Sequence, residues 1–152
     1  VKEVVLELGS NMIKLAGKGD NLEENRQKML EVVQNKKALE KFKQLVKHQG
    51  GDETYIDHPE KFEKARYIEK VIAKKDGEIV SLNAEEIGKL SVFLGAGRIR
   101  KEDKIDNSVG IVFEKKVGRR VKKGDIIAYI HANDEEKAKQ AVEKLEEVAI
   151  IK

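Results

Sequence analysis

The residues that are able to do chemistry are few, and the histidines among them are scattered. His48, His58 and His131 are the only three, and no H-x-x-x-H or E-x-x-H spacing links any of them. A zinc site or a catalytic cluster needs several ligands brought together in space. We therefore interpret the three histidines as a helix-end, a linker and a strand-end residue, and we predict no metal site.

The serines and the carboxylates offer no better nucleophile or acid–base pair. None of the four serines, at positions 10, 81, 91 and 108, lies in a G-x-S-x-G nucleophile elbow. Asp and Glu are plentiful, but they alternate with Lys along segments of helical spacing, which is typical of solvated helix faces. The sequence therefore predicts no catalytic, substrate-binding, cofactor-binding or metal-binding residue within the chain.

The segment GAGR at 95–98 is the one glycine-rich stretch that resembles a phosphate cradle. Backbone N–H groups of such a loop can bind an anion. However, GAGR is not G-x-G-x-x-G, and it follows an expected helix rather than a strand, which is the wrong context for a dinucleotide fold. The pattern favours a tight turn at Gly95 and Gly97.

The loop that begins with GAGR is rich in charge and runs over 95–108. Its cations are Arg98, Arg100, Lys101 and Lys104, and its acidic residues are Glu102, Asp103 and Asp106. An exposed loop of this length is suited to movement or to docking onto another domain. We predict that 95–106 is a candidate domain-closure loop, with Gly95, Gly97 and the four cations as its characteristic residues. A solvated surface loop is the alternative.

Composition excludes several classes of protein. The chain has 152 residues, and its 31 Lys+Arg against 28 Asp+Glu give a formal charge of +3. This near balance argues against a nucleic-acid binder, which would concentrate a basic excess. The absence of Cys excludes disulfides and thiolate metal sites. No stretch approaches the roughly 18 apolar residues of a membrane helix, and no secretory signal pattern is visible.

Hydrophobic spacing predicts two units of different character. Helices are expected at 1–16, 21–35 and 38–48. A polar stretch at 52–66 contains the only proline and reads as a linker. The second unit is expected to contain strands at 67–73, 78–82, 109–115 and 126–131, helices at 84–94 and 135–147, and a short edge strand at 149–152. The predicted fold class of this second unit is α+β.

Several residues sharpen these expectations. Gly9 lies inside the first helical pattern, which indicates close packing against a neighbour. Asn83 is expected to cap the helix at 84–94, with Glu86 at capping-box spacing. The inward residues of the last helix are expected to be Ala138, Ala141, Val142 and Leu145. Val1 begins directly inside a helical pattern without a capping residue, so we expect the chain to be a piece of a longer protein.

The segment 115–133 carries a more specific pattern. A strand, then V-G-x-x-V-x-x-G-D at 117–125, then a second strand indicates half of a biotinyl/lipoyl-like hammerhead, or barrel sandwich. Gly118 and Gly124 are expected in tight turns, with Val117 and Val121 pointing inward and Asp125 binding turn N–H groups.

The other half of the hammerhead pattern, at 71–83, does not indicate carrier chemistry. Lys74 and Lys75 lie near an expected turn, but neither has a Met-Lys-Met or Asp-Lys-Ala context. The sequence favours a carrier-like scaffold without the carrier reaction. A non-catalytic carrier-like or interaction module nevertheless stays open as an alternative function, as does a small regulatory domain of an unrelated protein.

Five segments, in this order and spacing, resemble the C-terminal portion of pyrimidine-nucleoside phosphorylases of the thymidine phosphorylase group. They are ELGSNMIKLAGK (7–18), ALEKFKQLVKHQGGD (38–52), IGKLSVFLGAGRIRKEDKID (87–106), SVGIVFEKKVGRRVKKGD (108–125) and IAYIHAND (127–134). The resemblance covers essentially the whole chain. The combination of GAGR with I-D-x-x-V-G and of V-G-x-x-V-x-x-G-D with I-H-A-x-D is its most specific part.

The resemblance implies a pentosyltransferase of pyrimidine metabolism and nucleoside salvage. Such enzymes split a pyrimidine nucleoside with inorganic phosphate into the free base and ribose or deoxyribose 1-phosphate. They use no organic cofactor, bind neither nucleic acid nor membrane, and are cytoplasmic homodimers whose contact lies on an N-terminal helical domain. The pattern leaves a preference for uridine or thymidine open, as well as a related archaeal nucleotide-phosphate phosphorylase.

The resemblance also implies a division of the chain. Residues 1–51 would be the helical C-terminal end of the α/β phosphorylase domain, 52–66 the linker, and 67–152 the C-terminal α+β domain with the hammerhead scaffold. The phosphate-binding and base-binding motifs of the family precede this stretch, so no catalytic residue is carried over. A fragment of this extent is expected to be inactive alone.

Overall fold

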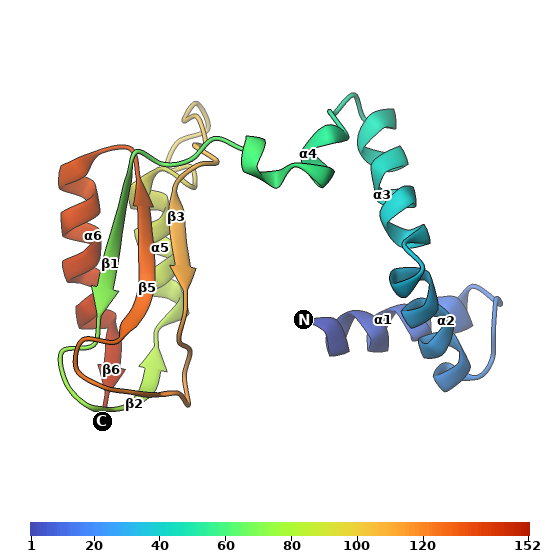
Figure 1. Ribbon diagram of the computed structural model, residues 1–152, viewed down its shortest axis with the longest axis horizontal. Helices are drawn as coiled ribbons and strands as arrows, with labels where there is room; N and C mark the ends of the chain where they lie inside the picture. The colour runs from blue at the N-terminus through green and yellow to red at the C-terminus, as the bar shows by residue number, and fades with distance from the viewer. The chain divides into compact units, whose positions relative to one another are not determined.

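The computed structural model describes all residues from 1 to 152, which form two compact units, Val1–Lys61 and Phe62–Lys152 (Figure 1). The division between the units falls inside the stretch 52–66 that the sequence predicts as a linker. No helix in either unit is both long enough and apolar enough to cross a membrane.

The N-terminal unit is entirely helical. It contains α1 (Lys2–Leu15), α2 (Leu22–Gln34), α3 (Lys37–His48), the short α4 (Thr54–Asp57) and the 3₁₀ turn η1 (Pro59–Lys61). The three predicted helices are therefore confirmed, whereas α4 and η1 lie within the predicted linker. Asn21 caps α2 because its side chain accepts the N–H groups of Glu23 and Glu24.

Helices α1 and α2 pack closely where glycine leaves room. A Cβ added at Gly9 would collide with the end of the Met29 side chain, which confirms the close contact that the sequence predicts there. Beside it, the buried Asn25 donates its amide to the carbonyls of Ser10, at 3.3 Å, and Gly19, at 2.8 Å. The α1–α2 corner is thus held by a polar side chain as well as by apolar contact.

The long apolar stripe of α1 is not the face that packs within this unit. Val4, Leu8 and Met12 are 59%, 61% and 68% exposed, whereas Leu6 and Ser10 on another side are buried. Small residues on that side allow α2 to approach, so the closest packing follows Leu6, Gly9 and Ser10 rather than the larger apolar side chains. Helix α3 likewise contains no buried residue.

The C-terminal unit is a mixed α+β structure, as predicted. Its elements are β1 (Tyr67–Ile72), β2 (Gly77–Leu82), α5 (Ala84–Leu94), β3 (Gly110–Phe113), β4 (Arg120–Val121), β5 (Ile126–Ala132), α6 (Glu135–Val148) and β6 (Ala149–Ile151). They form two antiparallel three-stranded sheets, with strand orders β1–β5–β3 and β4–β2–β6. The consecutive strands β1 and β2 therefore belong to different sheets, and β6 is an edge strand.

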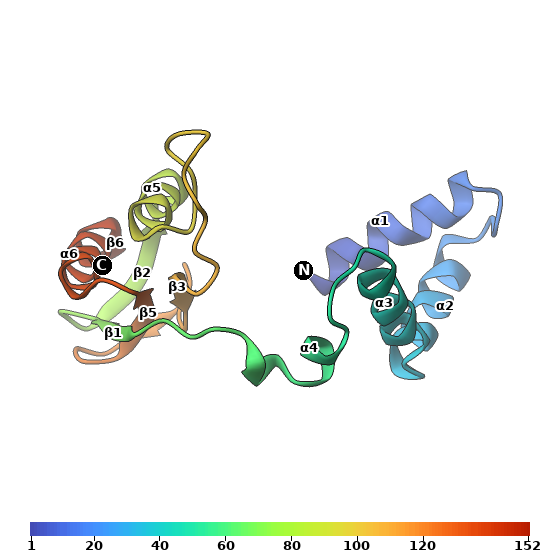
Figure 2. The same cartoon turned by 90° about the horizontal axis from the view of Figure 1, so that it is seen from above.

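The main core lies between the β1–β5–β3 sheet and helices α5 and α6, which cover one face of that sheet (Figure 2). The predicted inward residues Ala138, Ala141 and Leu145 of α6 are completely buried there, and Val142 packs against the same cluster. Two alanines on the inner side of α6 let the helix lie close to the strands. A second apolar cluster is built around Ile79 of β2 and Ile127 of β5, and it therefore joins the β4–β2–β6 sheet to a strand of the first sheet.

The V-G-x-x-V-x-x-G-D segment makes the predicted turns. Gly118 and Gly124 have positive φ values of 84° and 93°, and Asp125 Oδ2 accepts the Lys122 N–H at 3.0 Å. Val121 is buried, but the prediction that Val117 points inward is wrong, because its side chain is 55% exposed. This turn contacts the second sheet through its backbone rather than through the Val117 side chain, because the Gly118 N–H donates to the Ile79 carbonyl at 2.8 Å.

Candidate functional site

The loop from Gly95 to Asp106 connects α5 to β3, and two glycines build its start. Gly95 ends α5 with φ of 111°, and the N–H groups of Gly95 and Ala96 bind carbonyls of the last helical turn. A Cβ at Gly97 would lie only 2.7 Å from a methyl carbon of Val92. Both glycines thus serve a tight turn against the helix end, which is the interpretation that the sequence favours over a phosphate cradle.

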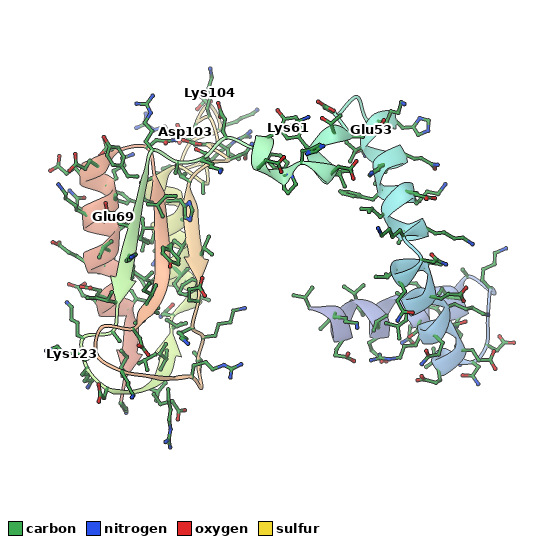
Figure 3. All side chains as sticks on the ribbon, viewed as in Figure 1. Glu53, Lys61, Glu69, Asp103, Lys104 and Lys123 are labelled. Carbon is green, nitrogen blue, oxygen red and sulfur yellow. The ribbon has the colours of Figure 1, made fainter.

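The tip of the loop forms a turn that a single carboxylate braces. Asp103 Oδ2 accepts the N–H groups of Ile99 at 3.0 Å and Arg100 at 2.8 Å. The Asp103 N–H donates in turn to the Arg100 carbonyl at 3.1 Å. Figure 3 shows Asp103 and Lys104 in this loop, at one end of the C-terminal unit, with Lys123 at the other end. The tip therefore has a defined backbone even though it projects into solvent.

The end of the loop is fastened at Asp106. Its N–H binds the Gly95 carbonyl at 3.0 Å and so joins the two ends of the loop. Its Oδ1 accepts the backbone N–H of Ser108 at 2.9 Å and the Ser108 hydroxyl at 2.7 Å. Its Oδ2 accepts the side-chain amide of Asn133 at 2.7 Å. Because these hydrogen bonds favour the ionised carboxylate, those from Ser108 most strongly, they lower the pKa of Asp106.

Asn133 extends this network to a third segment. Its amide nitrogen also donates to the Ser108 hydroxyl at 2.8 Å, and its carbonyl oxygen accepts the Arg66 N–H at 2.8 Å. The start of β1, the loop end and the β5–α6 connection therefore meet at one polar cluster. Sequence reasoning missed the roles of Asp106 and Asn133, and the only available signal was that both are Asx residues at the boundaries of expected elements.

The predicted loop cations all project from this anchored frame. Arg98, Arg100, Lys101 and Lys104 are exposed, and none of them forms an ion pair. The tip also carries an apolar side chain, because Ile99 is 80% exposed. The arrangement presents positive charge and one large apolar group on a short, braced turn. Such a surface is suited to binding a partner that carries negative charge.

The other sequence candidates lie on separate elements of the two units. His48 ends α3, His58 contacts Glu60 at 3.0 Å, and His131 lies in β5. No group of three or more His, Cys, Asp or Glu residues is arranged to hold a metal ion. Lys74 forms an ion pair with Glu146 at 2.8 Å, and this contact raises the pKa of the lysine.

Comparison with known families decides the nature of the C-terminal unit. Residues 78–152 match the family model of the pyrimidine nucleoside phosphorylase C-terminal domain. This part of the chain belongs to that family. The match includes α5, the Gly95–Asp106 loop, β3, β5 and the Asn133 that follows β5. The loop and most of its anchoring cluster are therefore parts of a phosphorylase C-terminal domain.

Similarity to curated proteins extends beyond this domain. The chain is 50% identical over 131 residues to the pyrimidine-nucleoside phosphorylases of Staphylococcus aureus strains USA300 and COL. These alignments cover 86% of the chain but only 30% of each relative. The chain thus corresponds to the C-terminal portion of a pyrimidine-nucleoside phosphorylase and spans less than a third of such a protein's length.

Proposed function

We propose that the chain supplies the C-terminal part of a pyrimidine-nucleoside phosphorylase. In this reaction an oxygen of inorganic phosphate bonds to C1′ of the nucleoside while the bond from C1′ to the base nitrogen breaks. The base leaves with the bonding electrons and takes up a proton, and the sugar becomes ribose or deoxyribose 1-phosphate. The identity of 50% to phosphorylases over 131 residues carries this proposal.

The groups that bind phosphate and base are proposed to lie outside these residues, so the isolated chain is inactive. Residues 1–51 are proposed to be the helical end of the α/β domain, and 67–152 to form the C-terminal domain on a hammerhead scaffold. Inorganic phosphate is the co-substrate, and no organic cofactor takes part. The enzyme is proposed to be a cytoplasmic homodimer whose subunit contact lies on an N-terminal helical domain, and to bind neither nucleic acid nor membrane.

Within this enzyme, we assign the Gly95–Asp106 loop to domain closure. Catalysis of this reaction requires phosphate to be held in line with C1′ and water to be excluded, which closing domains achieve. The loop fits that role because Asp106 and Asn133 fasten its base while its cations stay unpaired. A loop that only links α5 to β3 needs no such braced, cationic tip.

The proposed activity is tested by phosphorolysis. The complete subunit, incubated with inorganic phosphate and either uridine or thymidine, should release free base and sugar 1-phosphate, which chromatography resolves. The 152-residue chain alone should release neither product. Comparison of the two nucleosides in the same assay determines the preference that the sequence leaves open. A complete subunit that cleaves no pyrimidine nucleoside would contradict the proposal.

The carrier alternative gains no support from the turn that contains Lys74. A biotinyl or lipoyl acceptor must present a free lysine, whereas the Lys74 ammonium is engaged by Glu146. Mass spectrometry of the purified protein separates the two functions, since an adduct on Lys74 or Lys75 would favour the carrier.

A further inference from the structure

Ile99 is a large apolar residue that lies exposed between two arginines at the tip of the loop. Its side chain is 80% exposed, far more than the 44% of Ile105, the other isoleucine of the loop. Transfer of an apolar side chain of this size from water into an apolar environment is favourable by about 1.5–3 kcal/mol of free energy. Ile99 lies directly between Arg98 and Arg100, so the tip carries one apolar group flanked by two unpaired cations.

The backbone at the tip is organised before any partner arrives. The Asp103 carboxylate holds the N–H groups of both Ile99 and Arg100, at 3.0 and 2.8 Å. A segment that is already ordered loses less conformational entropy on binding than a flexible one. Asp103 is therefore a positioning residue that holds the backbone of Ile99 and Arg100.

We propose that Ile99 is an anchor that inserts, when the enzyme closes, into an apolar pocket edged by carboxylates on the remainder of the phosphorylase subunit. This inference rests on the proposed function. Since the chain spans only 30% of its relatives' length, most of such a subunit lies outside these residues. Carboxylates are expected at the edge of this pocket, because the guanidinium groups of the two flanking arginines bind carboxylates with paired hydrogen bonds.

The chemistry of the chain suits a direct test by thiol labelling. The chain contains no cysteine, so the variant Ile99→Cys introduces one thiol whose peptide is identified by mass spectrometry. Val117→Cys is the matched control, because Val117 is also exposed, at 55%, and also lies in a turn beside a cation, Lys116. Each variant is made in the complete subunit, and maleimide labelling is followed with and without inorganic phosphate plus uridine.

The proposal predicts that the substrates slow labelling at Ile99→Cys by about tenfold, as expected if the closed state becomes dominant. Labelling at Val117→Cys should change by less than about twofold under the same conditions. Equal rates with and without substrates at position 99, in an enzyme that turns over uridine, would overturn the inference and leave the proposed function intact. A complete unmodified subunit without phosphorolysis would instead contradict the function itself.

A second set of variants separates the anchor from a general effect of the loop. Ile99→Ser should lower kcat by about tenfold with little change in thermal stability, because a side chain that is 80% exposed contributes little to the packing of the C-terminal unit. Ile99→Leu, which keeps an apolar side chain of similar volume, should retain most of the turnover. Equal kcat values for the Ser variant and the unmodified enzyme would contradict an apolar anchor.

Discussion

The side-chain amide of Asn133 donates to the carboxylate of Asp106 across 2.7 Å, and this contact joins residues 27 positions apart in the sequence. The same Asn133 side chain accepts the Arg66 N–H. The base of the loop is thereby tied to two other segments of the C-terminal unit. The loop tip is instead braced only by Asp103 within the loop itself. The contrast separates a fixed base from a tip that is free to contact a partner.

Removal of the Asn133 side chain should loosen the loop base. We expect Asn133→Ala to lower the free energy of unfolding of the C-terminal unit by about 1–3 kcal/mol, because partly buried hydrogen-bonding groups lose their partner. Chemical denaturation measures this loss, and limited proteolysis should show faster cleavage within 95–106. Asn107→Ala is the control, since Asn107 is exposed and lies beside the same cluster. Equal stability of the Asn133 variant and the unmodified protein would refute the anchoring role.

The Asp106 cluster should make stability depend on pH on the acidic side. Hydrogen bonds from Ser108 and Asn133 lower the pKa of Asp106 below that of an unfolded aspartate. The stabilisation is therefore fully present above the unfolded pKa and is lost as the pH falls through the lower folded pKa. Asp106→Asn should be less stable than the unmodified protein near neutrality, and the difference should shrink on acidification.

Denaturation at a series of pH values checks this prediction. Glu102→Gln serves as a control because Glu102 is exposed in the same loop and forms no ion pair. A stability difference for Asp106→Asn that stays constant from neutral to strongly acidic pH would show that the charge of Asp106 contributes nothing.

The close contact between α1 and α2 should limit what a side chain at Gly9 contributes to stability. A Cβ at this position overlaps the flexible end of the Met29 side chain, which must move aside, so Gly9→Ala should lose most of the roughly 1 kcal/mol that the better helix propensity of alanine would otherwise contribute. The double variant Gly9→Ala, Met29→Ala should be less destabilised than the sum of the two single variants, because the shorter side chain at position 29 leaves room for the new Cβ.

Gly88→Ala provides a matched comparison for the Gly9 variant. Gly88 also lies within a helix, α5, but a Cβ there meets no atom within 4 Å. This change should be neutral or stabilising by up to about 1 kcal/mol, because only the helix propensity differs. Thermal unfolding followed by circular dichroism compares the variants. Equal effects of the two substitutions would mean that the Met29 contact does not constrain Gly9.

The sequence predicts the elements of this chain well because their signals are local. Asn83 accepts N–H groups of the first turn of α5, as its position before an apolar periodic segment predicts, and Asn21, expected as the first residue of its helix, caps α2 in the same way. The capping box at Asn83 is only half formed, since the Glu86 side chain binds Lys89 instead. The inward face of α6 follows equally from its spacing, with Ala138 and Leu145 buried as predicted.

Features that depend on contacts between distant segments were predicted poorly. Val117 and Val121 occupy equivalent places in the turn pattern, yet only Val121 enters a strand and becomes buried. The face on which α1 packs follows small residues around Gly9, whereas hydrophobic periodicity marks the larger side chains. The Asn133–Asp106 contact could not be predicted from the sequence, because no spacing rule connects residues that the arrangement of the sheet alone brings together.

Domain closure by this loop is tested most sharply by the turnover of a complete subunit from which 99–104, the tip of the loop, has been deleted. The fixed base at Asp106 should keep the C-terminal unit folded, so thermal stability should stay almost unchanged while kcat for phosphorolysis falls by about tenfold or more. An unchanged kcat in a subunit of unchanged stability would contradict a role of this loop in closure.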